Sequence, residues 1–478
     1  MRRAHFRCDM SGPRVVLTPV WEHTIGSGHA TLALRADWQE QLRRCHTELG
    51  IRRVRFHGLL SDDVGTLVRH GGRPLYSFFN ADQIWDYLLA TGMQPFVELS
   101  FTPVALASGK KTVFKYAGNV TPPRKMAQWT ELIRRLARHA VERYGADEVR
   151  EWNFEVWNEP NLKAFWAGTQ KQYFDLYAAT AGALKDVDGM LRVGGPATAE
   201  NGWLEPFLEF TGRRKLPLDF VTTHYYPTDP TQDVSGETEE QLAAGRRGVL
   251  SERASAARAI VGDLPLYYTE WNTSSNQRDP LHDEPYAAAF VTKTLLDVSG
   301  IVDAYSFWTF SDIFEELYLP SLPFHGGFGL LTLHGVAKPT YRAFELLHQM
   351  GRELIVPVDG LHPTVNCWVA AGRPRTHVLL TNHALPRHEI ETVAVRLRLD
   401  SMHPPRRATV TRIDDDHANP KRAWLEMGAP EHLSEPALKL LHDASGLTAE
   451  RLDVAVEDDA VTCELTVPPH GTAMVVIE

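Results

Sequence analysis

The stretch FEVWNEPN, residues 154–161, joins a strand-forming run to a polar end. Its apolar residues, such as Val156 and Trp157, favour a buried strand, yet Asn158 and Glu159 follow them directly. In a parallel barrel, functional side chains gather at the carboxyl ends of the strands. The stretch therefore predicts a strand that delivers an amide and a carboxylate to a site.

Apolar runs of the same character recur along the first two thirds of the chain, and helix-like amphipathic segments lie between them, for example at 129–145, 173–184, 239–261 and 286–298. The predicted strands are 18–26, 54–60, 94–101, 152–159, 191–197, 218–226, 265–272 and 303–310. Eight such units predict an α/β protein with a (β/α)₈ TIM barrel. An open doubly wound sheet is the alternative, but IGSGHA at 25–30 resembles its glycine-rich phosphate turn only weakly.

The pattern changes near residue 350, where alternating strands replace helices. We predict a barrel over residues 14–350 and an antiparallel β-sandwich domain over 351–478, with the boundary at 345–356 after a helix at 341–348. A helical piece at 434–445 interrupts the sandwich, and residues 1–13 are expected to pack on it.

Composition narrows the classes of function. The chain has 478 residues and a net charge of −10 without a basic block, which argues against nucleic acid or an anionic membrane as partner. No apolar run is long enough to span a bilayer. The cysteines are scattered without metal-like spacing, so we expect reduced thiols in a cytoplasmic protein; they are Cys8, Cys45, Cys367 and Cys463. The cluster DDDH at 414–417 is interpreted as a turn.

Polar side chains end several of the predicted barrel strands. They are Arg55, His57, Asn158, Glu159, His224, Tyr226, Glu270 and Trp308, followed by Glu315 and Glu316. Glu159 and Glu270 interrupt aromatic runs on the fourth and seventh strands, and a carboxylate pair at a barrel mouth fits glycoside hydrolysis. Each signal alone is weak, because NEP is also an ordinary helix start and a histidine among aromatics is more often a core residue.

Several longer motifs carry a resemblance to a known family. WNEP, HYYP and YTEW resemble the retaining glycosidases on (β/α)₈ barrels. More narrowly, VRFHGLLSDDVG (54–65), FEVWNEPNLKAFW (154–166), YSFWTFSDIFEE (305–316) and RIDDDHANPKRAWLEMG (412–428) resemble β-xylosidases of glycoside hydrolase family 39. The similarity extends over nearly the whole chain, including the sandwich.

The resemblance implies a role for each matching residue. Glu159 would be the acid/base and Glu270 the nucleophile, which Tyr226 would hold and Arg55 would keep ionised. Asn158 would bind the sugar 2-hydroxyl, and Phe114 would add an aromatic wall. The sugar that is cleaved off would be lined by His57, His224, Trp308, Glu315 and Glu316.

We therefore expect a retaining exo-β-1,4-xylosidase that acts on short xylo-oligosaccharides. This mechanism requires no metal or organic cofactor. Activity as an α-L-arabinosidase or α-L-iduronidase on the same scaffold is an alternative, although extra carboxylates near the sugar oppose an anionic uronate. A catalytically dead sugar-binding protein is the alternative from another class. A monomer is expected, because the chain ends soon after its last predicted strand.

Overall fold

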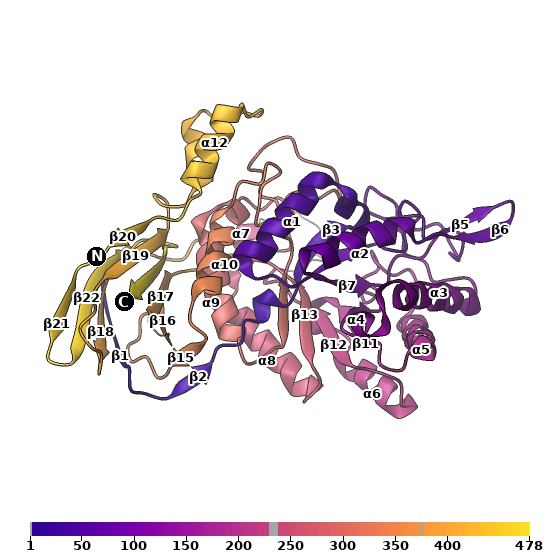
Figure 1. Cartoon of the computed structure of the whole chain (residues 1–478), viewed down its shortest axis with the longest axis horizontal. Helices are drawn as coiled ribbons and strands as arrows, with labels where there is room; N and C mark the ends of the chain where they lie inside the picture. Colours follow the sequence, from indigo (N-terminus) through magenta and orange to yellow (C-terminus); the bar gives the residue numbers. More distant parts are fainter. Residues whose placement is uncertain (1, 229–237, 373–374) are drawn as a thin grey trace.

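A computed structural model describes residues 2–228, 238–372 and 375–478. Eight parallel strands close into a barrel in the chain order that the sequence predicts (Figure 1). They are β3 (Ile25–His29), β4 (Arg53–His57), β7 (Gln94–Glu98), β10 (Asn153–Glu155), β11 (Arg192–Thr198), β12 (Phe220–His224), β13 (Leu266–Trp271) and β14 (Ala304–Phe307). The predicted (β/α)₈ barrel is confirmed.

Helices surround the barrel. They are α1 (Ala36–Leu49), α2 (Phe79–Thr91), α3 (Met126–Tyr144), α4 (Ala146–Val149), α5 (Gln170–Val187), α6 (Leu204–Arg214), α7 (Thr238–Ala244), α8 (Val249–Val261), α9 (Pro285–Val298) and α10 (Pro339–Gln349). The single helix predicted at 239–261 is wrong: it divides into α7 and α8 because Gly245 and Gly248 lie between them, and glycine disfavours a helix interior.

The first predicted strand is also shorter than expected. Residues Val20–Glu22, inside the run 18–26, form a turn of 3₁₀ helix directly after Pro19, and only Ile25–His29 joins the barrel. The glycine-rich turn at 25–30 is therefore largely a strand. Gly26 is required there, because a Cβ atom would lie 2.5 Å from Cε3 of Trp308.

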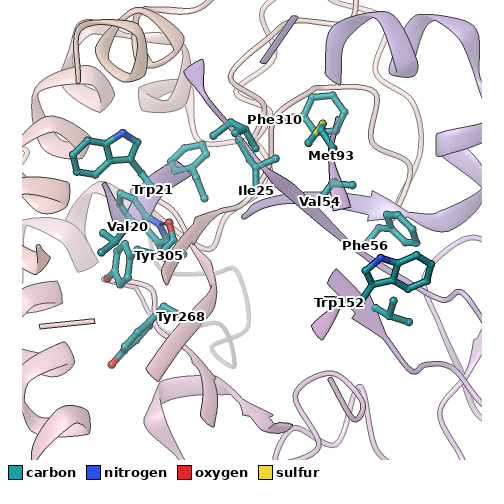
Figure 2. Close-up of a cluster of buried hydrophobic side chains, with 14 of the residues drawn as sticks. Val20, Trp21, Ile25, Val54, Phe56, Met93, Trp152, Tyr268, Tyr305 and Phe310 are labelled. Carbon is teal, nitrogen blue, oxygen red and sulfur yellow. Dashed lines mark hydrogen bonds between the residues drawn. The ribbon is translucent and has the colours of Figure 1, made fainter. Parts of the chain in front are cut away.

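Successive side chains of a barrel strand point alternately toward the surrounding helices and into the barrel, so one set packs in the core and the other faces the site. On β4, Val54 and Phe56 point outward into the large hydrophobic cluster between barrel and helices, part of which Figure 2 shows. Arg55 and His57 therefore point into the barrel. The interior below the site is closed by an apolar layer that consists of Phe96, Phe220, Tyr267 and Ala304.

Two sheets form the second domain, at the end of the molecule that also holds both chain termini (Figure 1). One sheet contains β1 (Arg2–Asp9), β18 (Val393–Asp400), β22 (Ala460–Val467) and β21 (Val454–Glu457). The other contains β2 (Arg14–Val16), β15 (Glu353–Ile355), β16 (Val365–Ala371), β17 (Thr376–Asn382), β23 (Thr472–Ile477), β19 (Ala408–Ile413) and β20 (Ala449–Arg451). Helices α11 (Pro420–Glu426) and α12 (Glu435–Ala444) lie between β19 and β20.

The N-terminal segment belongs to these sheets. Strand β1 pairs in parallel with β18, the one parallel pair that the described strands of the sandwich contain. Strand β2, which the sequence assigned to the barrel, pairs with β15 instead. Helix α9 contacts β17 and β23, so the last part of the barrel packs directly on the sandwich.

Two short hairpins complete the fold. They are formed by β5 (Leu67–His70) with β6 (Arg73–Tyr76), and by β8 (Thr112–Val113) with β9 (Gly118–Asn119). Among the helices that the structure describes, none has the length and apolar character to cross a bilayer.

Candidate active site

Two buried carboxylates face each other at the carboxyl end of the barrel. Glu159 follows β10 and Glu270 lies on β13, and each is only 5% exposed. One oxygen of each carboxylate and a ring nitrogen of His224 all lie within 4.8 Å of one another. Nδ1 of His224 is 3.0 Å from Oε1 of Glu159 and 3.5 Å from Oε2 of Glu270. The predicted pair is therefore brought together.

An irregularity in β13 aims Glu270 into the barrel. The pairing register with β12 shifts between Thr223 and His224, opposite Tyr268 and Glu270. Thr269 already points inward, since its hydroxyl donates to Oε1 of Glu155 at 2.8 Å. In a regular strand Glu270 would then point outward. The bulge lets both consecutive side chains reach the interior.

Arg55 connects the carboxylates below the mouth. Its guanidinium is completely buried and donates from Nε to Glu155 at 2.6 Å, from Nη1 to Glu270 at 2.8 Å and from Nη2 to Oδ1 of Asn158 at 2.9 Å. Nη2 also lies 2.9 Å from Oε2 of Glu98. A permanent cation with fixed donors thus holds Glu270 and Asn158 in one orientation.

The backbone that carries Glu159 is strained. Trp157 and Glu159 have φ values of 76° and 42°, in the left-handed region that non-glycine residues rarely adopt. The indole of Trp157 donates to the backbone oxygen of Phe165 and packs edge-on against Trp166. The backbone N–H of Glu159 donates to Ala197 at 2.7 Å. This packing fixes a chain reversal that points the carboxylate at the cavity.

Aromatic side chains form the walls. Tyr226 donates its hydroxyl to Oε2 of Glu270 at 3.2 Å. The Trp308 ring lies 4.7 Å from that of His57, and Phe114 lies on the other side of His57 with ring centres 5.9 Å apart. Apolar ring faces of this kind suit the C–H surface of a sugar ring.

Burial sets the protonation states of the site. It raises the pKa of Glu159 well above its ordinary value, and the negative charge of Glu270 adds to that effect. Burial likewise raises the pKa of Glu316, again reinforced by Glu270. Burial, Arg55 and His57 together lower the pKa of His224 well below its usual range, so this imidazole is neutral. A neutral carboxylic acid therefore lies beside a carboxylate that is paired with Arg55.

The cavity around the pair has a volume of about 720 Å³. Of the predicted site residues, it is lined by His57, Phe114, Asn158, Glu159, Tyr226, Glu270, Trp308 and Glu316. Arg55 and His224 lie behind Glu270 and make no part of the lining. Glu315 does not line the cavity either. It points toward His29, with 3.9 Å between Oε1 and Nδ1, because neighbouring side chains of an extended loop diverge.

Sequence reasoning missed two further buried carboxylates, Glu98 and Glu155. Nδ1 of His57 bonds Glu98 at 2.7 Å. Although burial alone would raise the pKa of Glu98, His57 and Arg55 outweigh it and lower that pKa. Burial outweighs Arg55 at Glu155, whose pKa is raised. A signal was present, since each interrupts an apolar predicted strand at an inward position.

Loop residues of the outer cavity were also missed. They include Leu162, Lys163 and Phe165 after β10, Thr228 after β12, Gln277 and Arg278 after β13, and Phe328 after β14. No strand or helix pattern places such residues, because the loops that carry them are defined only by the tertiary fold.

One set of groups among the described residues has the geometry to hold a metal ion, and it is Glu159, His224 and Glu270. A cation there would be repelled by the guanidinium of Arg55, 2.8 Å from Glu270. It would also occupy both carboxylates of the pair. The arrangement fits proton transfer and nucleophilic attack by the side chains themselves.

Comparisons with known proteins agree with this site. The model of "Glycosyl hydrolases family 39" matches residues 6–456. A curated relative named Beta-xylosidase, from Caldicellulosiruptor saccharolyticus, is 48% identical over 96% of this chain and 95% of its own length. Alpha-L-iduronidase from Homo sapiens is 26% identical over 82% of this chain and 65% of its own length.

Solved structures agree as well. The GH39 enzyme from Xanthomonas axonopodis pv. citri superposes with a TM-score of 0.88 at 32% identity, covering 100% of this chain and 98% of that one. A GH39 beta-xylosidase from Caulobacter crescentus gives a TM-score of 0.83 at 33% identity, covering 99% of each chain. The family match and the structural likenesses extend over nearly all of the sequence, including the barrel with its buried carboxylate pair. The chain belongs to glycosyl hydrolase family 39.

Proposed function

We propose that this glycoside hydrolase is a retaining exo-β-1,4-xylosidase, which releases D-xylose from the non-reducing end of short xylo-oligosaccharides. The observation that carries the proposal is the carboxylate pair, with oxygens within 4.8 Å of each other. Inverting enzymes separate their carboxyl groups by about 6.5–9.5 Å to admit a water, whereas retaining enzymes place them about 5–5.5 Å apart. The relatives named as beta-xylosidases support the choice of substrate.

In the first step, Glu270 attacks the anomeric carbon while Glu159 donates its proton to the leaving oxygen. A covalent xylosyl-enzyme forms, and the leaving sugar departs as an alcohol. In the second step, Glu159 takes a proton from water, which displaces Glu270 and releases β-xylose. The raised pKa of Glu159 supports the first role, since an acid must be protonated before it can donate.

Neighbouring groups support these roles. Arg55 and Tyr226 both bond the carboxylate of Glu270, which fixes its orientation for attack. Among the described residues, the buried Nδ2 group of Asn158 at the cavity wall has no hydrogen-bond partner, while Oδ1 of Asn158 accepts from Arg55. That free donor supports binding of a sugar hydroxyl next to the anomeric carbon. Glu316, a neutral acid in the lining, supports binding of the hydroxyls of a neutral pentose, whereas the carboxylate of Glu270 would repel an anionic uronate.

The test compares hydrolysis of p-nitrophenyl β-D-xylopyranoside by the wild type, Glu159→Ala and Glu270→Ala. Glu142→Ala, an exposed carboxylate on α3, is the control. We expect β-xylose as the first product by NMR and loss of at least about 10³-fold in kcat for Glu270→Ala. Added azide should restore turnover in Glu270→Ala with α-xylosyl azide as product.

Other outcomes would change the assignment. Cleavage of an α-L-arabinoside or an α-L-iduronide in place of the β-xyloside would keep the carboxylate pair and overturn the substrate. Binding of xylobiose without any cleavage would favour a sugar-binding protein. First release of α-xylose would indicate inversion and contradict the covalent intermediate.

We also propose that the enzyme is a cytoplasmic monomer that meets short oligosaccharides after their uptake. Four free cysteines, three of them buried, support a reducing compartment. Light scattering of the purified protein and fractionation of the producing cells test the two parts separately.

A further inference from the structure

The charged residues that line the cavity are acidic at its floor and basic at its mouth. Three acidic residues lie at the floor: Glu159 and Glu270 are buried, and Glu316 is half-buried. Two cations, Lys163 and Arg278, are the other charged residues in the lining that the structure describes. Both are exposed at the mouth. An acidic protein of net charge −10 thus places positive charge at the entrance to its own active site.

Lys163 has no carboxylate among the described residues within ion-pair distance. Its Nζ donates to the backbone oxygen of Gly168 at 3.2 Å, which uses one of three donors. A second exposed cation, Lys111, donates from Nζ to the backbone oxygen of Lys163 at 2.6 Å. Neither of these two ammonium groups therefore has an acid within ion-pair distance in the described ranges 2–228, 238–372 and 375–478.

Arg278 is likewise without an ion-pair partner among the described residues. Its guanidinium lies 4.2 Å from the ring centre of Tyr318, so the aromatic face holds the planar group in place. The backbone N–H of Arg278 donates to Oδ1 of Asn276, which is also part of the lining. The donors at the edge of the guanidinium remain free for a carboxylate, which this geometry binds best.

The position of Lys163 relates this rim to the leaving group. The acid/base carboxyl donates to the oxygen of the leaving sugar, so that sugar must pass beside the segment that carries Glu159. Lys163 follows Glu159 by four residues, and Phe165 of the same turn lines the cavity. The released xylose binds at the floor, whereas the rim faces the rest of the oligosaccharide, which is the leaving group.

We propose that the rim formed by Lys163 and Arg278 selects xylo-oligosaccharides whose leaving-group side carries a uronic acid. This inference rests on the proposed function and deepens it. Anionic sugar is disfavoured at the floor by the carboxylate of Glu270 and favoured at the mouth by the cations of Lys163 and Arg278. The same enzyme would reject a uronide as the cleaved sugar and prefer one as a branch of the departing chain.

The test uses a matched pair of substrates. One is xylobiose whose reducing-side xylose carries an α-1,2-linked glucuronic acid; the other is the same trisaccharide with that carboxyl group reduced to the alcohol. Release of D-xylose is measured for both. We expect kcat/KM to be about 3–10-fold higher for the acid, mainly through KM, because exposed charge pairs are individually weak. The ratio should fall toward one between about 20 mM and about 0.5 M salt.

Three variants assign the effect to the rim. Arg278→Gln and Lys163→Gln should each lower the ratio, and the double variant should abolish it. Arg451→Gln, an exposed cation on β20 of the sandwich, should leave the ratio as in the wild type. A wild-type ratio of one or less, or a ratio that survives the double variant, would overturn the inference while xylobiose is still cleaved. Failure to cleave any xyloside would instead overturn the proposed function.

Discussion

Nη1 of Arg55 lies 2.8 Å from Oε1 of Glu270, and the guanidinium that makes this contact is completely buried. The same guanidinium bonds Glu155 and contacts Glu98, which are also buried. The site is therefore built around one cation that both orients Glu270 and neutralises the carboxylates behind it. Activity and stability depend on the same side chain.

Replacing Arg55 should lower both the activity and the stability of the protein, to different degrees in two variants. Arg55→Met leaves Glu98 and Glu155 without their cation, and loss of one partner of a buried pair costs about 3–5 kcal/mol. Arg55→Lys keeps the charge but not the forked donors, so we expect a smaller loss of stability with a large loss of kcat. Urea unfolding and steady-state kinetics measure the two effects. Equal kcat in Arg55→Lys and the wild type would contradict the orienting role.

Glu270 should control the protonation of Glu159. Burial raises the pKa of Glu159 first, and the charge of Glu270 raises it further. Removing that charge in Glu270→Gln should lower the pKa of Glu159, although burial keeps it above the ordinary value. ¹³C NMR of labelled glutamate carboxyls measures the shift directly. In the wild type, kcat/KM should fall on the alkaline side as Glu159 loses its proton.

A matched variant separates this interaction from a general perturbation of the site. Glu98→Gln also removes a buried carboxylate near the site. The effect of Glu98 on the pKa of Glu159 is smaller than the effects of Glu270, Arg55 and Glu200. The pKa of Glu159 should therefore move less than in Glu270→Gln. An equal or larger shift in Glu98→Gln would contradict the pairing of the two proposed catalytic residues.

Much of the fold follows from the sequence because the barrel strands are fully buried. Runs such as 218–226 and 265–272 are rich in apolar and aromatic residues, and all eight predicted runs overlap a barrel strand. The elements whose predicted bounds differ from the structure do so for local reasons. Pro19 diverts the chain into a 3₁₀ turn, and the glycines at 245 and 248 interrupt a helix whose apolar periodicity continues across them.

The site was predictable where a strand positions the side chain. Glu159 and Glu270 interrupt buried runs, so their placement follows from strand order and alternation. Glu315 and Glu316 come from an irregular loop, and adjacent residues there point in different directions. Lys163 and Arg278 enter the cavity through loops whose path only the folded barrel defines.

The two loop carboxylates offer a direct comparison. Oε1 of Glu316 is 3.7 Å from Nε2 of His57 and lines the cavity, whereas Glu315 faces His29. Glu316→Ala should lower kcat/KM for xylosides by about 10–100-fold, as expected for loss of a strong hydrogen bond to a sugar hydroxyl. Glu315→Ala should change it by less than about 3-fold.

Glu316→Gln distinguishes hydrogen bonding from loss of volume. Burial raises the pKa of Glu316, so the group is a neutral acid that donates and accepts, as an amide does. The Gln variant should recover most of the activity that Ala loses, with steady-state kinetics as the measure. A larger loss in Glu315→Ala than in Glu316→Ala would contradict the observed placement of the two side chains.

Two histidines lie where the sandwich meets the barrel. His383 follows β17 and His470 precedes β23, and their rings lie 5.2 Å and 5.1 Å from that of Tyr286 on α9. Both ring nitrogens of His383 and Nδ1 of His470 are buried, and the part of the chain that the structure describes offers them no hydrogen-bond partner. Burial lowers the pKa of His383 well below its usual range, with Arg247, His470 and Lys293 adding to the effect, and it lowers the pKa of His470 to about 4.

Acid should therefore weaken the contact between the domains as these two histidines become protonated. A group whose pKa is lower in the folded state contributes stability above its unfolded value, near 6.5, and loses it as pH falls toward the folded value. His470→Phe removes the contribution of His470 to this pH dependence. The wild type should therefore lose about 1–3 kcal/mol more unfolding free energy than the variant between about pH 6.5 and about pH 4.5. His403→Phe, an exposed histidine of the same domain, is the control and should follow the wild type. Parallel pH profiles for the wild type and His470→Phe in urea unfolding would show that His470 is not coupled to folding.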